Sequence, residues 1–288
     1  MEKISFYKMS GAGNDFILID RNKVSGIILN QDLIRRLCDR RNGIGADGVI
    51  TISNSQSYDF EMEYFNADGS TGSLCGNGAR CAIKFADLSG RIKSGKTNFL
   101  SNSIPYSGEV LDRNKIRFNF NSPKNLKFNF YINAYNQMIN ACYADTGSPH
   151  VIIKVEDILR EPGNPKSYFT NLNELPVFVI GKEIRYHGDF EPIGTNVNFI
   201  KIADNKVYIR TYERGVEDET LACGTGATAS ALIAHYVHKL MPPVHLITKG
   251  GDELIVDFSI EGKNITKLSL TGPAKITFTG EFSLNQFN

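Results

Sequence analysis

The chain has 288 residues, of which 41% are hydrophobic and 22% charged, and its formal net charge is +1. This length allows two domains of ordinary size or one large domain with a well-formed core. Because the charge is nearly balanced, we expect neither nucleic acid nor a membrane surface as a partner. No apolar run approaches the roughly 20 residues that cross a bilayer, and the first residues lack a signal-peptide pattern. We therefore expect a cytoplasmic protein.

In the first part of the chain, alternating apolar and polar residues predict strands. A helix is expected at about residues 32–39, with Asn30 as its cap. A second helix should begin at the sequence Cys75-Gly76-Asn77-Gly78. The predicted strands are residues 16–19, 58–64 and 116–120. The polar stretch at residues 119–127 contains Pro123 and predicts a connection rather than an element.

The second part of the chain is also rich in predicted strands. They cover residues 150–155, 196–202, 206–212, 253–258 and 275–278. A third helix should begin at Cys223-Gly224-Thr225-Gly226, directly after a strand and a turn-rich stretch. At an offset of 148 residues this segment matches the one at Cys75 in its cysteine, two glycines and following alanine. The match indicates an internal duplication whose boundary lies near residue 122.

The five cysteines form an odd set without a repeated C-x-x-C spacing. This argues against a disulfide framework and against a zinc site. A single buried cysteine is usually an apolar filler. Two cysteines at the same point of a duplicated helix start favour a functional role over a structural one. The amides and the dipole of a helix start attract anions, and they raise the thiolate fraction of a thiol placed there.

The duplicated helix starts suit stereoinversion at a carbon next to a carboxylate. Neither the phosphate-binding loop nor the dinucleotide-binding glycine pattern is present, so nucleotide binding is disfavoured. If the two halves pack about a pseudo-two-fold axis, their amides can hold one carboxylate while the two thiols flank its α-carbon. One thiol then removes the proton from one face and the other delivers a proton to the opposite face. The amides would stabilise the developing negative charge without a cofactor.

Six stretches of the sequence together resemble the diaminopimelate epimerase family. They occur in the order of that family and span most of the chain: residues 8–16 (KMSGAGNDF), 41–48 (RNGIGADG), 65–70 (FNADGS), 75–81 (CGNGARC), 194–199 (GTNVNF) and 212–215 (YERG) followed by 222–227 (ACGTGA). Each glycine-rich piece is a weak signal alone, whereas the set is highly specific.

The resemblance implies a mixed α/β fold of two similar domains related by pseudo-two-fold symmetry. Each domain would be a mixed sheet or barrel around a central helix, with the active site in the cleft between them. The domains would be residues 1–121 with 273–288, and residues 122–272. The implied reaction converts LL-diaminopimelate to meso-diaminopimelate, in lysine and cell-wall precursor synthesis, without cofactor or metal. The family also suggests a homodimer.

The resemblance also implies roles for individual residues. Cys75 and Cys223 would be the acid and base pair, with Glu213 and His150 beside them as further catalytic groups. The implied substrate-binding residues are Asn14, Gly48, Asn66, Gly76, Asn77, Ser148, Asn196, Glu213, Arg214, Gly224 and Thr225. Arg214 can meet a distal carboxylate bidentately and Glu213 an ammonium group, which suits a substrate charged at both ends.

Two of these positions depart from the family pattern. Ser148 stands where the family commonly has Asn, and Gly48 where some members have Gln.

The residues alone leave other functions open. A racemase of another amino acid on the same fold, as in the proline racemases, would not need Arg214 and Glu213. A thiol-redox or cysteine-hydrolase protein would need a resolving cysteine or a His/Asn dyad, and a binding protein without turnover would not need two cysteines.

Overall fold

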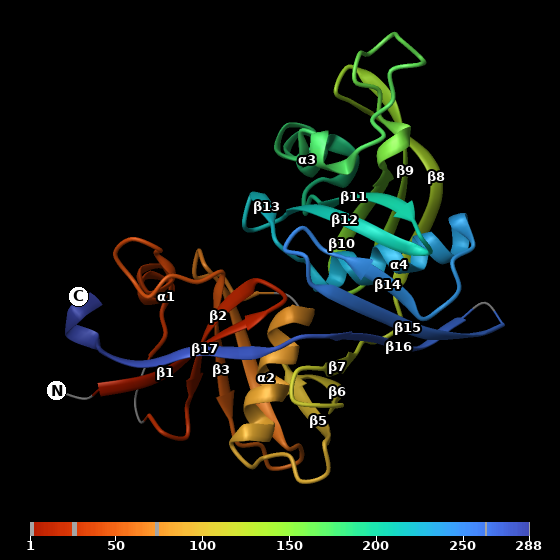
Figure 1. Cartoon of the computed structure of the whole chain (residues 1–288). Helices are drawn as coiled ribbons and strands as arrows, with labels where there is room; N and C mark the ends of the chain where they lie inside the picture. The colour runs from red at the N-terminus through yellow and green to blue at the C-terminus, as the bar shows by residue number, and fades with distance from the viewer. Residues whose placement is uncertain (1–2, 25–27, 73–74, 263, 288) are drawn as a thin grey trace. The chain divides into compact units, whose positions relative to one another are not determined.

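The computed structural model describes residues 3–24, 28–72, 75–262 and 264–287. The chain divides into two compact units: Met1–Asn119 with Thr271–Asn288, and Phe120–Leu270. Both are mixed α/β structures (Figure 1). Among the residues described, no helix is long and apolar enough to cross a membrane.

The first unit is a mixed sheet with two helices. In chain order its elements are β1 (Lys3–Gly11), β2 (Asn14–Asp20), α1 (Gln31–Cys38), β3 (Gly48–Ser53), β4 (Phe60–Asn66), α2 (Gly76–Leu88), β5 (Lys96–Ser101), β6 (Ile104–Val110), β7 (Ile116–Asn119), β17 (Lys275–Ser283) and the short 3₁₀ helix η4 (Leu284–Phe287). The pairs β2–β3 and β4–β5 are parallel, and the pairs β17–β1, β1–β2, β3–β4, β5–β6 and β6–β7 are antiparallel.

The second unit has the same kind of organisation. Its elements are β8 (Lys124–Ala134), β9 (Gln137–Asp145), β10 (Pro149–Lys154), η1 (Val155–Asp157), η2 (Leu172–Glu174), α3 (Val177–Arg185), η3 (Gly188–Phe190), β11 (Asn196–Ala203), β12 (Lys206–Glu213), β13 (Asp218–Thr220), α4 (Gly224–His238), β14 (Val244–Ile247), β15 (Glu253–Glu261) and β16 (Asn264–Gly272), whose end passes the boundary between the units. The pairs β10–β11 and β12–β14 are parallel, and the pairs β8–β9, β9–β10, β11–β12 and β14–β15 are antiparallel.

The order of these pairings is the same in both units. Antiparallel and parallel pairs alternate in the run β1, β2, β3, β4, β5, β6, and they alternate in the same order in the run β9, β10, β11, β12, β14, β15. The central helix comes after the fourth strand of each run, α2 after β4 and α4 after β12 and the short strand β13. The fold therefore contains the repeat that the two cysteine segments indicated.

Each unit wraps its sheet around one buried helix. In the first unit α2 contacts β1, β2, β3, β4, β6 and β7, and in the second α4 contacts β9, β10, β11, β12, β14 and β15. All residues of α2 from Gly76 to Ala86 and all residues of α4 from Gly224 to Ala234 are buried. A helix that is buried on all sides over most of its length is typical of a central core element. Small residues in α4 let the surrounding strands approach closely.

In each unit the topology brings the ends of neighbouring strands together. Because β2 and β3 are parallel, their first residues lie at the same edge, where Phe16 pairs with Gly48. Since β4 is antiparallel to β3, its last residue, Asn66, also reaches this edge opposite Gly48. In the second unit His150 and Asn196 pair at the corresponding starts of β10 and β11.

Most of the predicted elements are confirmed, including Asn30 as the cap of α1 and a cysteine at the start of each central helix. The stretch 119–127 was predicted as a connection, and this is wrong for its last part, since β8 begins at Lys124. No element was predicted at residues 177–185, where α3 forms.

Candidate active site

In the first unit, Cys75 is the residue that caps α2. Its backbone is extended (φ −111°, ψ 107°), and its Sγ accepts a hydrogen bond from the backbone N–H of Gly78 at 3.4 Å. A cap normally carries an oxygen that satisfies one of the free amides of the first turn. Here a sulfur takes that position, in the positive field of the helix start.

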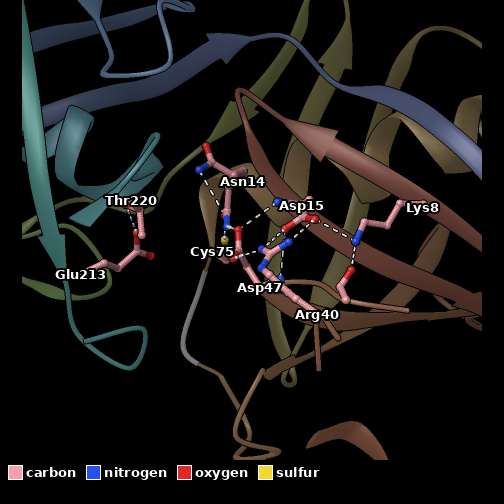
Figure 2. A network of polar contacts seen from close by, with 10 residues as sticks. Lys8, Asn14, Asp15, Arg40, Asp47, Cys75, Glu213 and Thr220 are labelled. Carbon is pink, nitrogen blue, oxygen red and sulfur yellow. Dashed lines mark hydrogen bonds and ion pairs between the residues drawn. The ribbon is translucent and has the colours of Figure 1, made fainter. Parts of the chain in front are cut away.

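Asn14, the first residue of β2, lies beside Cys75 (Figure 2). The Cys75 thiol donates to Asn14 Oδ1 at 3.7 Å, and Asn77 Nδ2 donates to the same oxygen at 3.3 Å. The orientation of Asn77 is fixed in turn by Arg80, whose Nη2 donates to Asn77 Oδ1 at 2.9 Å. Asn14 Nδ2 donates to Asp47 Oδ2 at 2.6 Å.

Asp47 belongs to a network of two carboxylates and two cationic side chains that extends from Asn14 to Lys8 (Figure 2). Arg40 bridges Asp15 and Asp47 at 2.8 and 2.7 Å, and Lys8 pairs with Asp15 at 2.8 Å. Burial pushes the pKa of Asp15 upward, but the hydrogen bonds and charges of Arg40 and Lys8 outweigh it and lower this pKa to about 2. Burial, and then the charge of Asp15, raise the pKa of Asp47.

Asn66 and Gly48 lie opposite each other on β4 and β3. Asn66 Nδ2 donates to Ser70 Oγ at 3.0 Å, within the turn that follows β4. A Cβ at Gly48 would lie 2.5 Å from the carbonyl oxygen of Phe65 and 2.6 Å from the ring of Tyr64. No larger side chain fits at Gly48 unless this neighbouring strand shifts.

In the second unit, Cys223 precedes α4 with the same extended backbone (φ −119°, ψ 116°). Its Sγ lies 3.5 Å from Thr225 Oγ1, and this hydroxyl lies 2.9 Å from His150 Nε2. The backbone carbonyl of Thr225 accepts from Thr146 Oγ1 at 2.9 Å. His150 reaches this point because it is near the start of β10, which contacts α4.

Asn198 holds the other nitrogen of His150. Asn198 Nδ2 lies 3.0 Å from His150 Nδ1 and donates to the carbonyl of Val151 at 3.0 Å, while its Oδ1 accepts from Thr211 Oγ1 at 2.9 Å. Complete burial, followed by the charge of Arg214, lowers the pKa of His150 to about 3, so the ring is neutral near physiological pH. A Cβ at position 226 would lie 2.3 Å from Asn198 Oδ1, so Gly226 is required for this packing.

Asn196, Ser148 and Arg214 form a second polar group in this unit. Asn196 Nδ2 donates to Ser148 Oγ at 3.0 Å, and its Oδ1 accepts from the backbone N–H of Arg214 at 2.9 Å. Arg214 Nη2 also donates to Ser148 Oγ at 3.3 Å. Among the residues described, no carboxylate forms an ion pair with this guanidinium. Burial, and then the charge of Arg185, lower its pKa.

Glu213 ends β12, next to Arg214 in sequence. Its Oε2 accepts from Thr220 Oγ1 at 2.7 Å (Figure 2). This hydrogen bond orients the carboxylate on the short strand pair of β12 and β13.

The five cysteines are present as thiols rather than as disulfides. Burial raises the pKa of Cys38 and of Cys81 to about 12 and also raises the pKa of Cys142. These three thiols remain protonated near neutral pH and are apolar fillers. In the described part of the chain, no group of three or more His, Cys, Asp or Glu residues is placed to hold a metal ion.

The structure brings together predicted residues within each unit. Cys75, Asn14 and Asn77 form one group; Cys223, Thr225 and His150 form another. No role was predicted for Asp47, Asn198 or Thr220. A signal existed for Asn198, because it lies two residues after Asn196 on a predicted strand and therefore faces the same side. Asp47 lies in a quoted motif, but nothing in the motif indicated its contact with Asn14.

Comparison with solved structures assigns the class of fold. The crystal structure of a probable proline racemase from Agrobacterium radiobacter K84, with bound carbonate, matches 99% of this chain and 94% of its own at a TM-score of 0.72 and 14% identity. This chain therefore has the mixed α/β fold of the proline racemases.

Comparison with protein sequences narrows this class. The family model for diaminopimelate epimerase matches residues 6–114 and 142–277. The diaminopimelate epimerase of Chlorobaculum tepidum is 40% identical over 279 residues, covering 96% of this chain and 100% of that protein. The enzyme of the same name from Aquifex aeolicus is 35% identical and covers 97% of this chain and 98% of its own. The chain belongs to the diaminopimelate epimerase family, which confirms the resemblance seen in the motifs.

Proposed function

We propose that this protein interconverts LL- and meso-diaminopimelate by two-base catalysis, with the Cys75 and Cys223 thiols acting on opposite faces of the same α-carbon. One observation carries the proposal. The two units have the same topology, and in each of them a cysteine directly precedes the central helix. The membership in the diaminopimelate epimerase family supports the substrate.

The chemistry at the two helix starts supports proton transfer next to a carboxylate. The amides of Gly76, Asn77, Gly224 and Thr225 lie in the first turns, where helix dipoles favour negative charge. Removal of an α-proton spreads negative charge into the carboxylate, and donors already in place stabilise that charge without further reorganisation. We propose that stabilisation of the charge by these amides makes a cofactor unnecessary.

The second polar group of the second unit supports recognition of the distal end of the substrate. We propose that Arg214 binds the distal carboxylate and that Glu213, oriented by Thr220, binds an ammonium group. Asn14, Gly48, Asn66, Ser148 and Asn196 would line the remaining surface of the substrate, and His150 would act beside Cys223. We also propose that the protein is a cytoplasmic homodimer.

The direct test is incubation of the purified, reduced protein with LL-diaminopimelate in deuterium oxide. We expect α-hydrogen exchange and formation of the meso isomer, and the meso isomer should not form with Cys75→Ala or Cys223→Ala. Absence of both from the unmodified protein would refute the function. Full activity in either alanine variant would refute the two-base scheme.

A second test addresses the distal end of the substrate. Arg214→Lys keeps the charge but loses the bidentate geometry, so we expect KM to rise by about 10-fold or more with a smaller change in kcat. Arg160→Lys is a matched control, because Arg160 forms an exposed ion pair with Glu174 and such pairs contribute little. Equal KM values for the two variants would contradict the role of Arg214.

A further inference from the structure

We propose that Arg185 keeps the carboxylate of Glu217 away from Arg214, so that the Arg214 guanidinium meets the distal carboxylate of the substrate without a competing acid. Arg185 is then a positioning residue, which acts on the substrate through Glu217 and Arg214. The inference rests on the proposed function, because it concerns the group that we assign to the distal end of the substrate.

Arg214 lies inside a tight turn that Glu217 closes. The backbone N–H of Glu217 donates to the carbonyl oxygen of Glu213 at 2.8 Å, and Glu217 Oε1 accepts from the backbone N–H of Gly215 at 3.0 Å. Glu217 therefore holds the residue before Arg214 and the residue after it. Its φ is 58°, a left-handed conformation that is uncommon for a glutamate. The turn thus brings an acid and a cation close together.

Glu217 forms its ion pair with Arg185 and not with Arg214. Arg185 Nε donates to Glu217 Oε1 at 3.1 Å, and Arg185 Nη2 lies 3.0 Å from the same oxygen. The other oxygen, Oε2, is buried and has no hydrogen-bond partner among the residues that the structure describes. A buried acceptor without a donor is unfavourable. If Arg185 were absent, Glu217 would therefore gain a donor by turning toward another cation.

Arg185 is itself held firmly in place. It is the last residue of α3, and its guanidinium lies 4.6 Å from the centroid of the Tyr186 ring. It also packs against Gly194, where an added Cβ would collide with Arg185 Nη1. Only 14% of the Arg185 side chain is exposed. Stacking and close packing restrict the guanidinium, so it fixes the direction in which the Glu217 carboxylate points.

The guanidinium of Arg214, by contrast, contacts neutral oxygens. Nη1 donates to the carbonyl of Ile193 and Nη2 to Ser148 Oγ, both at 3.3 Å. These bonds are long for a charged donor, whose hydrogen bonds to a carboxylate are typically about 2.7–2.9 Å. Ile193 directly precedes Gly194, so Arg185 packs beside one chain segment that contacts Arg214 and binds the turn that contains it.

Electrostatics show that Glu217 is within reach of Arg214. Burial, and then the positive charge of Arg185, lower the pKa of Arg214, whereas the negative charges of Asp145 and Glu217 raise it. Asp145 is engaged elsewhere, since its Oδ1 accepts from the backbone N–H of Gly147 at 3.0 Å. Glu217 acts on Arg214 even while it is bound to Arg185, and it would act more strongly without that partner.

This arrangement favours a substrate with a carboxylate at its distal end. An acid already paired with Arg214 would have to be displaced before a substrate carboxylate could bind, and the binding would be weaker by that amount. With Arg185 in place, the charges of Arg185 and Glu217 compensate each other. Arg214 then remains a cation for the substrate. Without Arg185, Glu217 and Arg214 would neutralise each other.

The test compares KM and kcat for LL-diaminopimelate in variants of the full chain. Arg185→Met removes the charge and keeps an unbranched apolar stem, so we expect KM to rise about 10-fold with a smaller change in kcat. Arg185→Gln should give the same rise and provides the comparison if Arg185→Met does not fold. Arg185→Lys keeps a cation for Glu217, and its KM should stay within about 3-fold of the unmodified value.

A double variant separates this role from a merely structural one. Glu217→Gln removes the competing acid, so Arg185→Met/Glu217→Gln should return KM to within about 3-fold of the unmodified value. A structural role predicts a double variant that is at least as impaired as Arg185→Met. Arg160→Met is the matched control, because Arg160 pairs with Glu174 at an exposed site and such pairs contribute little. Its KM should not change.

Two results would overturn the role of Arg185: an unchanged KM in Arg185→Met and Arg185→Gln, or a double variant whose KM is as high as that of Arg185→Met. In either case the unmodified protein would still exchange the α-hydrogen of LL-diaminopimelate, and only this inference would have failed. Absence of exchange from the unmodified protein would refute the proposed function, and the inference with it. Urea unfolding of every variant shows whether a change in KM accompanies a loss of stability.

Discussion

Replacement of Thr225 by Val removes one hydroxyl and nearly preserves the shape of the side chain. That hydroxyl joins His150 Nε2 at 2.9 Å to Cys223 Sγ at 3.5 Å. A hydrogen bond to a charged group contributes about 1.5–3 kcal/mol, and one unit on the pH axis corresponds to about 1.36 kcal/mol. We therefore expect the activity of Thr225→Val to fall about 10- to 100-fold near neutral pH. Activity should recover as the pH rises, with the lower limb of the profile shifted by about 1–2 units.

The same substitution also affects the stability of the second unit. It leaves the buried N–H of His150 without its acceptor, which costs about 1–3 kcal/mol. Thr228→Val is a matched control in the same helix, because the buried Thr228 hydroxyl donates only to Gly224 O, at 2.9 Å. We expect Thr228→Val to leave the pH profile in place. Initial rates of α-hydrogen exchange against pH, with urea unfolding of both variants, provide the measurement. Identical pH profiles for the two variants would refute the reasoning.

Three further predictions concern the surroundings of the two cysteines. Gly226→Ala should lower the free energy of unfolding by about 1–3 kcal/mol, because the added Cβ would lie 2.3 Å from Asn198 Oδ1. Gly78→Ala is the control and should be nearly neutral, because the nearest atom there is the flexible Ile50 Cδ1 at 3.2 Å. Urea unfolding compares the two variants, and equal losses of stability would contradict the packing argument. Asp47→Asn should lower kcat by about 10-fold, with a smaller effect on KM, because Asn14 is no longer held by a carboxylate; steady-state kinetics measure this, and an unchanged kcat would refute it. The pKa of His150 falls from 6.5 to about 3 on folding, so below pH 6.5 the unfolded chain binds a proton that the native protein does not. Stability should therefore fall on acidification by up to about 1.4 kcal/mol per pH unit, and His150→Gln should lack this part of the slope in urea unfolding at about pH 7 and about pH 5; an identical slope would exclude His150 as its source.

The central elements were predictable because their sequence patterns reflect the contacts they make. Among the strands around α2 and α4, β7, β12 and β15 largely alternate between buried and more exposed residues, and both helices begin at glycine-rich segments. The strand β8 was not predicted, because most of its side chains are exposed and no burial pattern indicates a strand. In addition, Asn125 and Asn129 both have φ of 52°. Asparagine tolerates that conformation and is also typical of turns.

The helix α3 was missed for a different reason. Its sequence VFVIGKEIR contains β-branched residues and a glycine, which have low helix propensity. Gly181 is present because a Cβ there would lie 2.5 Å from Tyr212 Cβ. Tertiary packing therefore decides this element, and local sequence preference does not.

The candidate site was predictable in its residue types but not in its hydrogen-bond directions. A motif can place Asn14 near Cys75, but it does not show which atom of the amide faces the sulfur. That direction depends on Asp47, which is 33 residues away in sequence. Likewise, the neutral form of His150 that donates to Thr225 is set by Asn198, 48 residues away on a neighbouring strand.

The repeated topology has a consequence for how such an enzyme can be encoded. A protein made of two identical copies of one unit would surround both sulfurs with the same side chains, so any substitution that favoured a thiol would favour it twice. Joining the copies in one chain lets each position mutate independently of its counterpart. Asn14 with Asp47 on one side, and Thr225 with His150 on the other, show how far such divergence can proceed while the strand order stays the same. Giving both halves the same set of these residues would restore equivalence and surround the two sulfurs with the same partners.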